Sequence, residues 1–294
     1  MGSRLFLALL WLLHGLPLAL QAVIGRGLGW LLYVLAPARR KVALRNLELC
    51  LPERSAAERH ALAREHFKWL GRSVLERGLL WYASPERLRR LIRVEGDVTL
   101  AERSDRPVMW LVPHFMGLDV AGVSVLLFQS RKVASIYQEQ SNPVMDAAIR
   151  RGRVRLGDAS RVQIFPRSDS AKPLLRAIRS GDAFFNLPDM DFGERDAAFV
   201  PFFGVPAATL LAPSRMARAM NMVVQPVVAQ MLPGGQGYVV RFLPPWTDFP
   251  SDDPLADTAR MNSWIESEIR RLPAQYLWVH KRFKTRPPGE PALY

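Results

Sequence analysis

The organisation of this chain is clearest in the segment Val108-Met-Trp-Leu-Val-Pro-His-Phe-Met-Gly-Leu-Asp119. Its first five residues are all apolar, as expected for a buried strand. Pro113 ends this run, and Gly117 permits a tight turn before a second apolar stretch with helical character. We therefore predict a strand, a turn that begins at His114, and a helix whose first turn contains Asp119. Strand, turn and helix in this order are the unit from which α/β folds are built.

Strand-like and helix-like runs continue to alternate along the rest of the chain. Further runs with strand character are Lys132–Tyr137, Val162–Phe165, Ala183–Leu187, Met222–Val228 and Tyr238–Leu243. Runs with helix character are Phe115–Phe128, Pro143–Arg151, Asp169–Arg179, Pro206–Met220 and Leu255–Leu272. This alternation predicts an α/β domain with a largely parallel sheet.

The region before the first strand reads as helical. Ser55 and Glu58 have the spacing of a capping box, which marks the start of a helix. His60 and His66 point to different faces of that helix, so we do not interpret them as ligands. We divide the chain into an N-terminal anchor with a basic flank (1–45) and one larger domain (46–294). The larger domain has a helical lead-in (46–95), an α/β core (96–250) and a C-terminal helix and tail (251–294).

The N-terminus is strongly apolar. Leu5 to Ile24 has about the length needed to cross the core of a bilayer. Three interpretations compete: a cleaved signal peptide, a buried core helix, and a membrane anchor that crosses the bilayer or lies in its interface. The cleavage pattern near Ala22 is imperfect and the chain stays apolar beyond it, which favours the anchor. Basic residues follow the stretch, so the bulk of the chain should face the cytoplasm.

The composition points to anionic partners. The formal net charge is +13, and only six of the 40 basic residues are lysines, so the excess is mainly arginine. Arginine binds phosphate and carboxylate groups with a planar fork. Phospholipid or glycolipid phosphates, nucleic acid and an acidic carrier protein all fit, although genomic base composition could produce the same bias. The single cysteine, Cys50, allows no intrachain disulfide and no cysteine-rich metal site.

His114 and Asp119 can cooperate only at a corner of the chain. Residues five apart on one ideal helix lie about 140° apart around its axis. The two side chains can therefore meet only if His114 stays in the turn while Asp119 is in the helix. Such a pair can hold the imidazole tautomer and stabilise the imidazolium that forms when the histidine takes a proton. A capping or salt-bridged histidine is the alternative interpretation of the same residues.

The residues around this corner resemble the signature of the H-x4-D/E glycerolipid acyltransferases. More specifically, the chain resembles the lipid A late acyltransferases, the lauroyl and myristoyl transferases of lipopolysaccharide biosynthesis. Four further blocks match this family in the same order: Asn142 to Arg155, Arg167, Asn186–Gly193 with Phe199–Thr209, and Pro273–Gly289. One position departs from the pattern, because members often carry Glu where Asp119 stands. Aspartate keeps the charge but is one methylene shorter.

This resemblance implies a glycerolipid-acyltransferase-like sheet flanked by helices, behind a hydrophobic membrane-anchoring helix. It implies transfer of a fatty acyl chain from acyl carrier protein to a hydroxyl of a lipid A precursor, on the cytoplasmic face of the bacterial inner membrane. His114 would be the general base and Asp119 would orient it. The thioester donor is already activated, so the resemblance implies no cofactor and no metal, and it implies no nucleic acid partner.

Three further residues are substrate-binding candidates: Arg153, Arg167 and Asp189. Each arginine could instead be a solvated helix-end residue, and Asp189 could bind substrate or tie down Arg167. For His280, in the last block, we favour a structural role. The aromatic residues Phe184, Phe185, Phe202 and Phe203 could line an acyl groove or belong to the core. Two alternative functions stay open: an acyltransferase acting on another membrane glycerolipid or a lysophospholipid, and a non-catalytic, membrane-tethered anion-binding protein.

Overall fold

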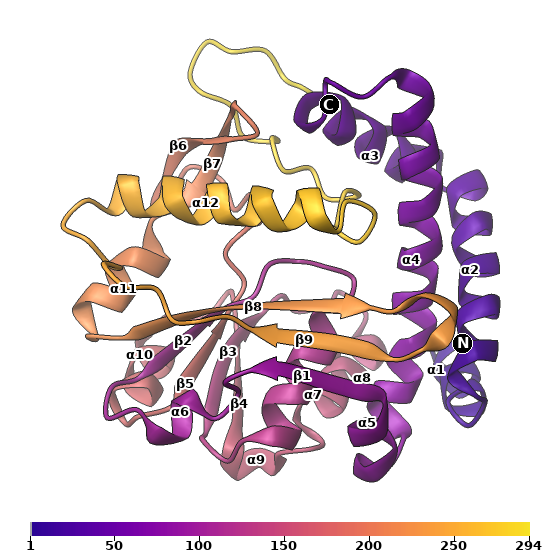
Figure 1. Cartoon of the computed structure of the whole chain (residues 1–294), viewed down its shortest axis with the longest axis horizontal. Coiled ribbons are helices and arrows are strands. Elements are labelled where there is room, and N and C mark those ends of the chain that lie inside the picture. Colours follow the sequence, from indigo (N-terminus) through magenta and orange to yellow (C-terminus); the bar gives the residue numbers. More distant parts are fainter. Residues whose placement is uncertain (1) are drawn as a thin grey trace.

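A seven-stranded sheet lies at the centre of the computed structural model, which describes residues 2–294 except for the side chains of residues 158 and 159 (Figure 1). The strand order is β1-β9-β8-β2-β5-β3-β4. Neighbouring strands are parallel, apart from the antiparallel pair β8 and β9. The predicted α/β class with a largely parallel sheet is therefore confirmed. The strand bounds are β1 Ile92–Gly96, β2 Val108–Leu111, β3 Val133–Tyr137, β4 Val162–Pro166, β5 Ala183–Asn186, β8 Val223–Met231 and β9 Tyr238–Phe242.

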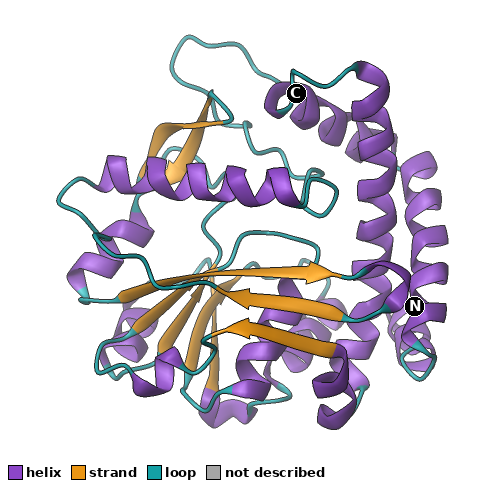
Figure 2. Cartoon of the chain, viewed as in Figure 1, coloured by secondary structure: helices purple, strands orange, loops and turns teal. Residues whose placement is uncertain are grey.

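Helices cover both faces of this sheet, as Figure 2 shows. One face carries α12 and the hairpin formed by β6 (Ala197–Phe202) and β7 (Val205–Leu210), and the other carries α7. The helices are α1 Gly2–Leu13, α2 Leu18–Leu35, α3 Pro37–Cys50, α4 Ala56–Tyr82, α5 Pro85–Leu91, α6 Leu100–Arg103, α7 Leu118–Phe128, α8 Pro143–Val154, α9 Asp158–Arg161, α10 Lys172–Arg179, α11 Ala212–Ala219 and α12 Pro254–Arg271.

Strand β2 is buried on both sides, which explains its unbroken apolar sequence. All four of its residues are buried. Val108 and Trp110 belong to the core that α7 completes, whereas Met109 and Leu111 belong to the core that α12 completes. Successive side chains of a strand point to opposite faces, so a central parallel strand needs apolar residues at every position. This arrangement fixes β2 in the middle of the fold and places His114 beyond its carboxyl end.

The largest difference from the predicted elements lies at residues 197–210. The run from Pro206 was predicted to be helical, but β6 (Ala197–Phe202) and β7 (Val205–Leu210) form an antiparallel hairpin there. Phe203 and Gly204 connect the two strands, with φ of 51° and 75°. Two central residues with positive φ make the kind of two-residue turn that suits the twist of paired strands. The helix of this region is shorter and begins at Ala212.

Smaller differences concern element boundaries. Residues 46–95 were predicted to be helical throughout, but β1 occupies the end of this region and pairs with β9. Helix α10 begins at Lys172, a few residues after the predicted Asp169, and Gly181 with φ of 96° follows its end. The predicted capping box is confirmed, because the Ser55 side chain accepts from Glu58 N–H and the Glu58 carboxylate accepts from Ser55 N–H.

The apolar N-terminal stretch is two helices rather than one. The apolar stretch from Leu5 to Ile24 covers most of α1, the turn between Leu13 and Leu18, and the start of α2. Proline cannot continue a helix from the preceding turn, which explains the break. Among the described residues, only α2 is long and apolar enough to cross a membrane, judged by length and composition. The expected domain boundary at residue 45 falls inside α3.

Both N-terminal helices pack against α4 and do not stand apart from the domain (Figure 1). A Cβ atom added at Gly29 would lie 2.1 Å from the Phe67 carbonyl oxygen, and one at Gly71 would lie 2.3 Å from the Gly25 carbonyl oxygen. Such backbone contact between α2 and α4 requires glycine at these positions. The opposite sides of α1 and α2 are rich in exposed large apolar side chains, for example Leu5, Trp11, Leu12, Val23, Trp30 and Leu35.

Candidate functional site

The corner after β2 places His114 in a turn and Asp119 in the following helix, as the spacing of the two residues predicts. Pro113 and His114 lie between the strand and the helix, and Asp119 is in the first turn of α7. Gly117 forms the N-cap of α7, and a Cβ atom there would lie 2.8 Å from the Ala229 carbonyl oxygen of β8. The close approach to β8 therefore explains the glycine in this turn.

His114 is held by Asp189. The Nδ1–H of His114 donates to Asp189 Oδ1 at 2.7 Å, and the backbone N–H of His114 donates to Asp189 Oδ2 at 2.9 Å. The Asp189 side chain is fully buried, whereas that of His114 is 16% exposed. A neutral imidazole that donates through Nδ1 keeps a lone pair on Nε2, which is then free to take a proton.

The environment of Asp189 keeps its carboxylate ionised. Burial raises the pKa of Asp189, but the charge and hydrogen bonds of His114 and a hydrogen bond from Tyr276 outweigh this effect, so the pKa is below its usual value. Tyr276 is itself buried, and burial together with the Asp189 charge raises its pKa well above the usual value. Tyr276 therefore stays protonated and donates to Asp189. The carboxylate is positioned from three sides.

Asp119 lies in the predicted first turn of α7 but does not make the predicted contact with His114. Its carboxylate accepts from Arg77 Nε at 3.0 Å and lies 3.5 Å from Arg153 Nη2, so it is paired with two arginines rather than with His114. Burial raises the pKa of Asp119, but the charges of Arg77 and Arg153 outweigh it and the pKa is lowered. The contact that orients His114 comes instead from Asp189, 75 residues further along the chain.

Arg77 is a site residue that the sequence analysis missed. It lies on α4, within the helical lead-in, and it lines the same cavity as His114. A signal was present in the sequence, because Leu70, Val74, Arg77 and Trp81 follow one another at helical spacing and all line the cavity. A single arginine on an otherwise apolar stripe of a helix needs an acidic partner on the element packed against it, because burying an unpaired charge is costly.

Of the three residues predicted to bind substrate, Arg153 and Arg167 line the same cavity, whereas Asp189 is buried behind His114 and does not line it. Arg153 is in the last turn of α8, and its side chain is 35% exposed. Arg167 follows β4; its guanidinium lies 4.2 Å from the centre of the Phe192 ring and donates to the Phe192 carbonyl at 3.4 Å. Within the described chain, Asp189 binds His114 and Tyr276 and makes no ion pair with Arg167.

His114, Asp119 and the three arginines line one cavity of about 600 Å³. Its wall is formed by α4, the corner after β2, the ends of β3 and β5, and the C-terminal segment, including Leu70, Met116, Tyr137, Phe184, Phe185, Leu187 and Leu277. A smaller apolar pocket of about 70 Å³ adjoins it and shares Trp81, Leu118, Phe185 and Leu187 with it. Phe202 and Phe203 do not line either space, and Phe202 is part of the core. No cluster of three or more potential metal ligands occurs among the described residues.

The C-terminal block lies directly beside the histidine. Phe115 and Tyr276 form a β-bridge, and the backbone N–H of Leu277 donates to the His114 carbonyl at 3.0 Å. Asp191 extends the connection, since its carboxylate accepts from the Thr285 N–H at 2.7 Å and from the Thr285 hydroxyl at 2.8 Å. The two aspartates of the Asn186–Gly193 block therefore have separate tasks. Asp189 holds the histidine, and Asp191 holds the end of the chain against it.

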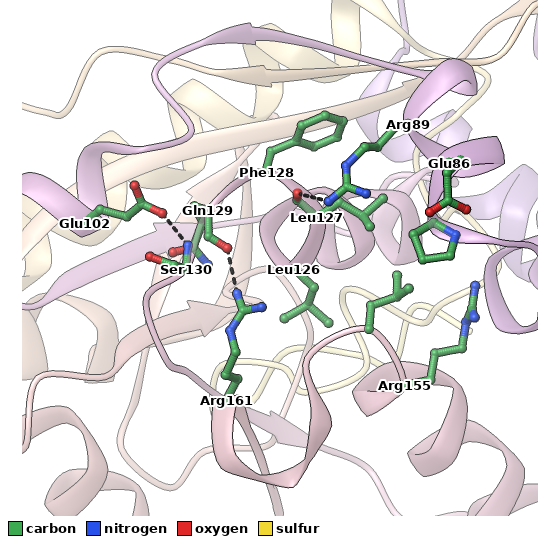
Figure 3. A pocket seen from close by; sticks show the side chains of 12 residues that line it. Glu86, Arg89, Glu102, Leu126, Leu127, Phe128, Gln129, Ser130, Arg155 and Arg161 are labelled. Carbon is green, nitrogen blue, oxygen red and sulfur yellow. Dashed lines mark hydrogen bonds between the residues drawn. The ribbon is translucent and has the colours of Figure 1, made fainter.

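A second hollow, of about 550 Å³, lies near the far end of α7 and is shown in Figure 3. Its arginines are already engaged by backbone carbonyls: Arg89 donates to Leu127 at 3.1 Å, and Arg161 donates to Gln129 at 2.6 Å. Arg155 likewise donates to Leu80 near the end of α4, at 2.9 Å. Among the described residues that line this hollow there is no histidine, and its arginines are bound by backbone carbonyls, so we centre the candidate site on the His114 cavity.

Comparison with known proteins identifies the family of the chain. Residues 2–285 match the model of the bacterial lipid A biosynthesis acyltransferases. Two relatives from Escherichia coli K12, a lipid A biosynthesis palmitoleoyltransferase and a lauroyltransferase, are each 33% identical over 291 residues, covering 98% of this chain and 92% and 93% of theirs. A myristoyltransferase from the same organism is 32% identical over 258 residues, or 87% of this chain and 78% of its own. The chain is thus a member of the bacterial lipid A biosynthesis acyltransferase family.

Proposed function

We propose that the chain transfers a fatty acyl group from acyl carrier protein to a hydroxyl of a lipid A precursor, with His114 as the general base. One observation carries the mechanism: His114 is fixed through Nδ1 by a buried carboxylate, and its side chain lines a cavity rich in apolar groups. This leaves Nε2 as the available base, within reach of a bound substrate.

In the proposed reaction, the acceptor hydroxyl oxygen attacks the thioester carbonyl carbon while Nε2 of His114 takes the hydroxyl proton. The carbonyl electrons move onto its oxygen and form a tetrahedral oxyanion. When the carbonyl forms again, the carbon–sulfur bond breaks and the thiolate leaves with its electron pair. The imidazolium of His114 then returns the proton to the thiolate. The products are an ester and a thiol, and Asp189 stabilises the charged histidine between the two proton transfers.

The arginines around the cavity suit the anionic groups of the proposed substrates. Arg77 and Arg153 are both about one third exposed, and they share the single charge of Asp119, so together they retain positive charge. Arg167 lies on the same cavity. We infer that these three arginines contact the phosphates of the glycolipid, in which case raising the salt concentration weakens binding. The net charge of +13 also favours an acidic carrier protein.

The acyl chain needs an apolar environment near the base. We infer that it runs from the main cavity into the adjoining pocket, which is lined by Val123, Val133, Val162, Ile164 and other apolar residues. Gly122 lies at this pocket, and a Cβ atom added there would meet nothing within 4 Å. The pocket can therefore be filled by substitution without disturbing the backbone.

The N-terminal helices suit attachment to the membrane from which the glycolipid comes. Helix α4 contributes one wall of the cavity and also packs against α1 and α2, whose outer sides expose large apolar residues. We propose that these sides contact the bacterial inner membrane, with the catalytic domain on its cytoplasmic face. An acceptor lipid would then enter the cavity along α4.

The test is an in vitro transfer assay with the purified full-length chain, lauroyl–acyl carrier protein and a lipid A precursor, followed by mass spectrometry. We expect acylation of the glycolipid by the wild type and by His60→Gln, an exposed histidine on α4, and none by His114→Gln. A lysophospholipid acceptor in parallel distinguishes the alternative substrate. Transfer only to the lysophospholipid would refute the lipid A assignment, and full activity of His114→Gln would refute the catalytic one.

A further inference from the structure

His280 lies on the wall of the same cavity as His114 but takes no part in the mechanism described so far. It belongs to the C-terminal block and follows Leu277, whose backbone binds the His114 carbonyl. The two histidines are close enough for the charge of His114 to affect the titration of His280. Besides Asp189, His280 is therefore a second titratable neighbour of the proposed base.

One ring nitrogen of His280 is occupied by a backbone donor. The N–H of Asp191 donates to Nε2 of His280 at 3.2 Å. A nitrogen that accepts a hydrogen bond carries no proton, so the neutral ring has its proton on Nδ1. Within the described residues, Nδ1 has no hydrogen-bond partner, and this nitrogen is not buried. It is therefore an accessible N–H donor without a partner, on a residue that lines the cavity.

We propose that His280 is a further catalytic residue, which donates the hydrogen bond of Nδ1–H to the thioester carbonyl oxygen as this becomes an oxyanion. The inference rests on the acyl transfer proposed above. The proton stays on His280 throughout, because the hydroxyl proton passes by way of His114 to the leaving thiolate. His280 therefore lowers the energy of the tetrahedral state without changing the balance of the reaction.

The surroundings of His280 favour a neutral donor. Burial, followed by the charge of His114, lowers the pKa of His280 to about 4. The ring therefore stays uncharged at neutral pH even while His114 carries the transferred proton. The two histidines thus have opposite partners, a carboxylate at His114 and a backbone N–H at His280. Such differences in environment are what separate a base from a neutral electrophilic donor in one site.

The position of His280 is also fixed before substrate binds. Its carbonyl accepts from Asn46 Nδ2 at 2.6 Å and from the Arg282 N–H at 3.0 Å. Asp191, which holds the ring, is itself bound to Thr285 through its carboxylate. A donor that is held in place needs no reorganisation during the reaction, and loss of one such donor typically lowers kcat by about 10²–10³-fold.

Two variants separate a catalytic from a structural role. His280→Gln can keep an acceptor near the position of Nε2 for the Asp191 N–H, but it has no donor at the position of Nδ1. His280→Asn can place an amide N–H near Nδ1, but it loses the acceptor for Asp191. Both are compared with the wild type and His60→Gln by steady-state kinetics with lauroyl–acyl carrier protein and a lipid A precursor. Thermal unfolding of each variant is measured in parallel.

We expect kcat to fall about 10²–10³-fold in His280→Gln with little change in KM, and His280→Asn to be about tenfold or more faster than His280→Gln. The inference is overturned if the Gln variant keeps kcat within about threefold of the wild type, or if the Asn variant is no faster than the Gln variant, as a structural tie to Asp191 predicts. If the wild type transfers no acyl group, the proposed function fails and this inference fails with it. An active wild type with an inactive His114→Gln and a fully active His280→Gln refutes this inference alone.

Discussion

Substitution of Asp189 by asparagine tests the central feature of the site. In the wild type, the carboxylate accepts from the ring and the backbone N–H of His114 and from Tyr276. Asparagine can accept at only one of its two positions. If its oxygen faces the backbone N–H of His114, its amide donates to Nδ1 and forces the ring proton onto Nε2. If it turns the other way, the amide faces the backbone N–H and two donors oppose each other. Either orientation removes or disturbs the base.

The expected loss in kcat is about 10³–10⁴-fold, because replacing the buried aspartate behind a catalytic histidine by asparagine costs about 10⁴-fold in the best-studied case. That corresponds to about 4–5.5 kcal/mol of transition-state stabilisation. The distances support the upper part of the range, since the ring contact of 2.7 Å is a short, charge-assisted bond to a fully buried side chain. The value of KM should change little, because Asp189 lies behind the histidine and does not face the substrate.

The assay is steady-state transfer from lauroyl–acyl carrier protein, with Asp257→Asn as the matched control. Asp257 is also buried, and it accepts from the Ser214 hydroxyl at 2.6 Å and from the Ser251 N–H at 3.0 Å, away from the cavity. Both variants should lose stability on thermal unfolding, but only Asp189→Asn should lose kcat. If Asp189→Asn retains more than about a tenth of the wild-type kcat, Asp189 does not orient the base and the reasoning is wrong.

Three further predictions concern the pocket, the core and the N-terminal helices. Gly122→Leu should fill the apolar pocket of about 70 Å³ and shift the preferred donor to a shorter acyl chain, measured by competition between acyl carrier proteins of different chain length; an unchanged preference would place the chain elsewhere. Burial lowers the pKa of His66 to about 4, below the value of 6.5 in the unfolded chain. The contribution of the neutral His66 to the free energy of unfolding is therefore complete above pH 6.5 and is lost as the pH falls towards 4. Between pH 7 and 5, the free energy of urea unfolding should fall by about 2 kcal/mol more in the wild type than in His66→Leu. Equal losses in the two proteins would contradict the lowered pKa of His66. Gly29→Ala should destabilise the chain by about 1–3 kcal/mol because the new methyl group meets the α4 backbone at 2.1 Å, whereas Gly27→Ala, which meets nothing within 4 Å, should be neutral or stabilising in thermal unfolding.

The sequence was sufficient for the features that depend on neighbouring residues. The apolar run that begins at Val108 determines a strand, and Pro113 and Gly117 determine the turn that leads into a helix. The structure has all three. The capping box at Ser55 fixes the start of α4 in the same local way. Local periodicity is less informative at the β6–β7 hairpin, where a short apolar run without a clear period does not distinguish a strand from a helix. The positive φ angles at the turn, which set the hairpin, are not visible in composition.

The partners of the charged groups are decided by the tertiary structure. Asp119 is five residues from His114 in the sequence, but Arg77 and Arg153 bind its carboxylate, while Asp189 reaches the ring from the loop after β5. A buried carboxylate is stabilised by whichever donors the fold brings to it, and separation along the chain does not limit that choice. For the same reason, no pattern in the sequence indicated that His280 lines the cavity.

The N-terminus shows the same division. Composition alone determined that the first residues form apolar helices, because few polar side chains interrupt them. Pro17 accounts locally for the break between the two helices. Only the three-dimensional arrangement decided that both helices pack on α4, through contacts in which glycine lets the backbones approach. Periodicity records which side of an element avoids water, but it does not record which element covers that side. That second choice depends on shape complementarity between segments far apart in the chain.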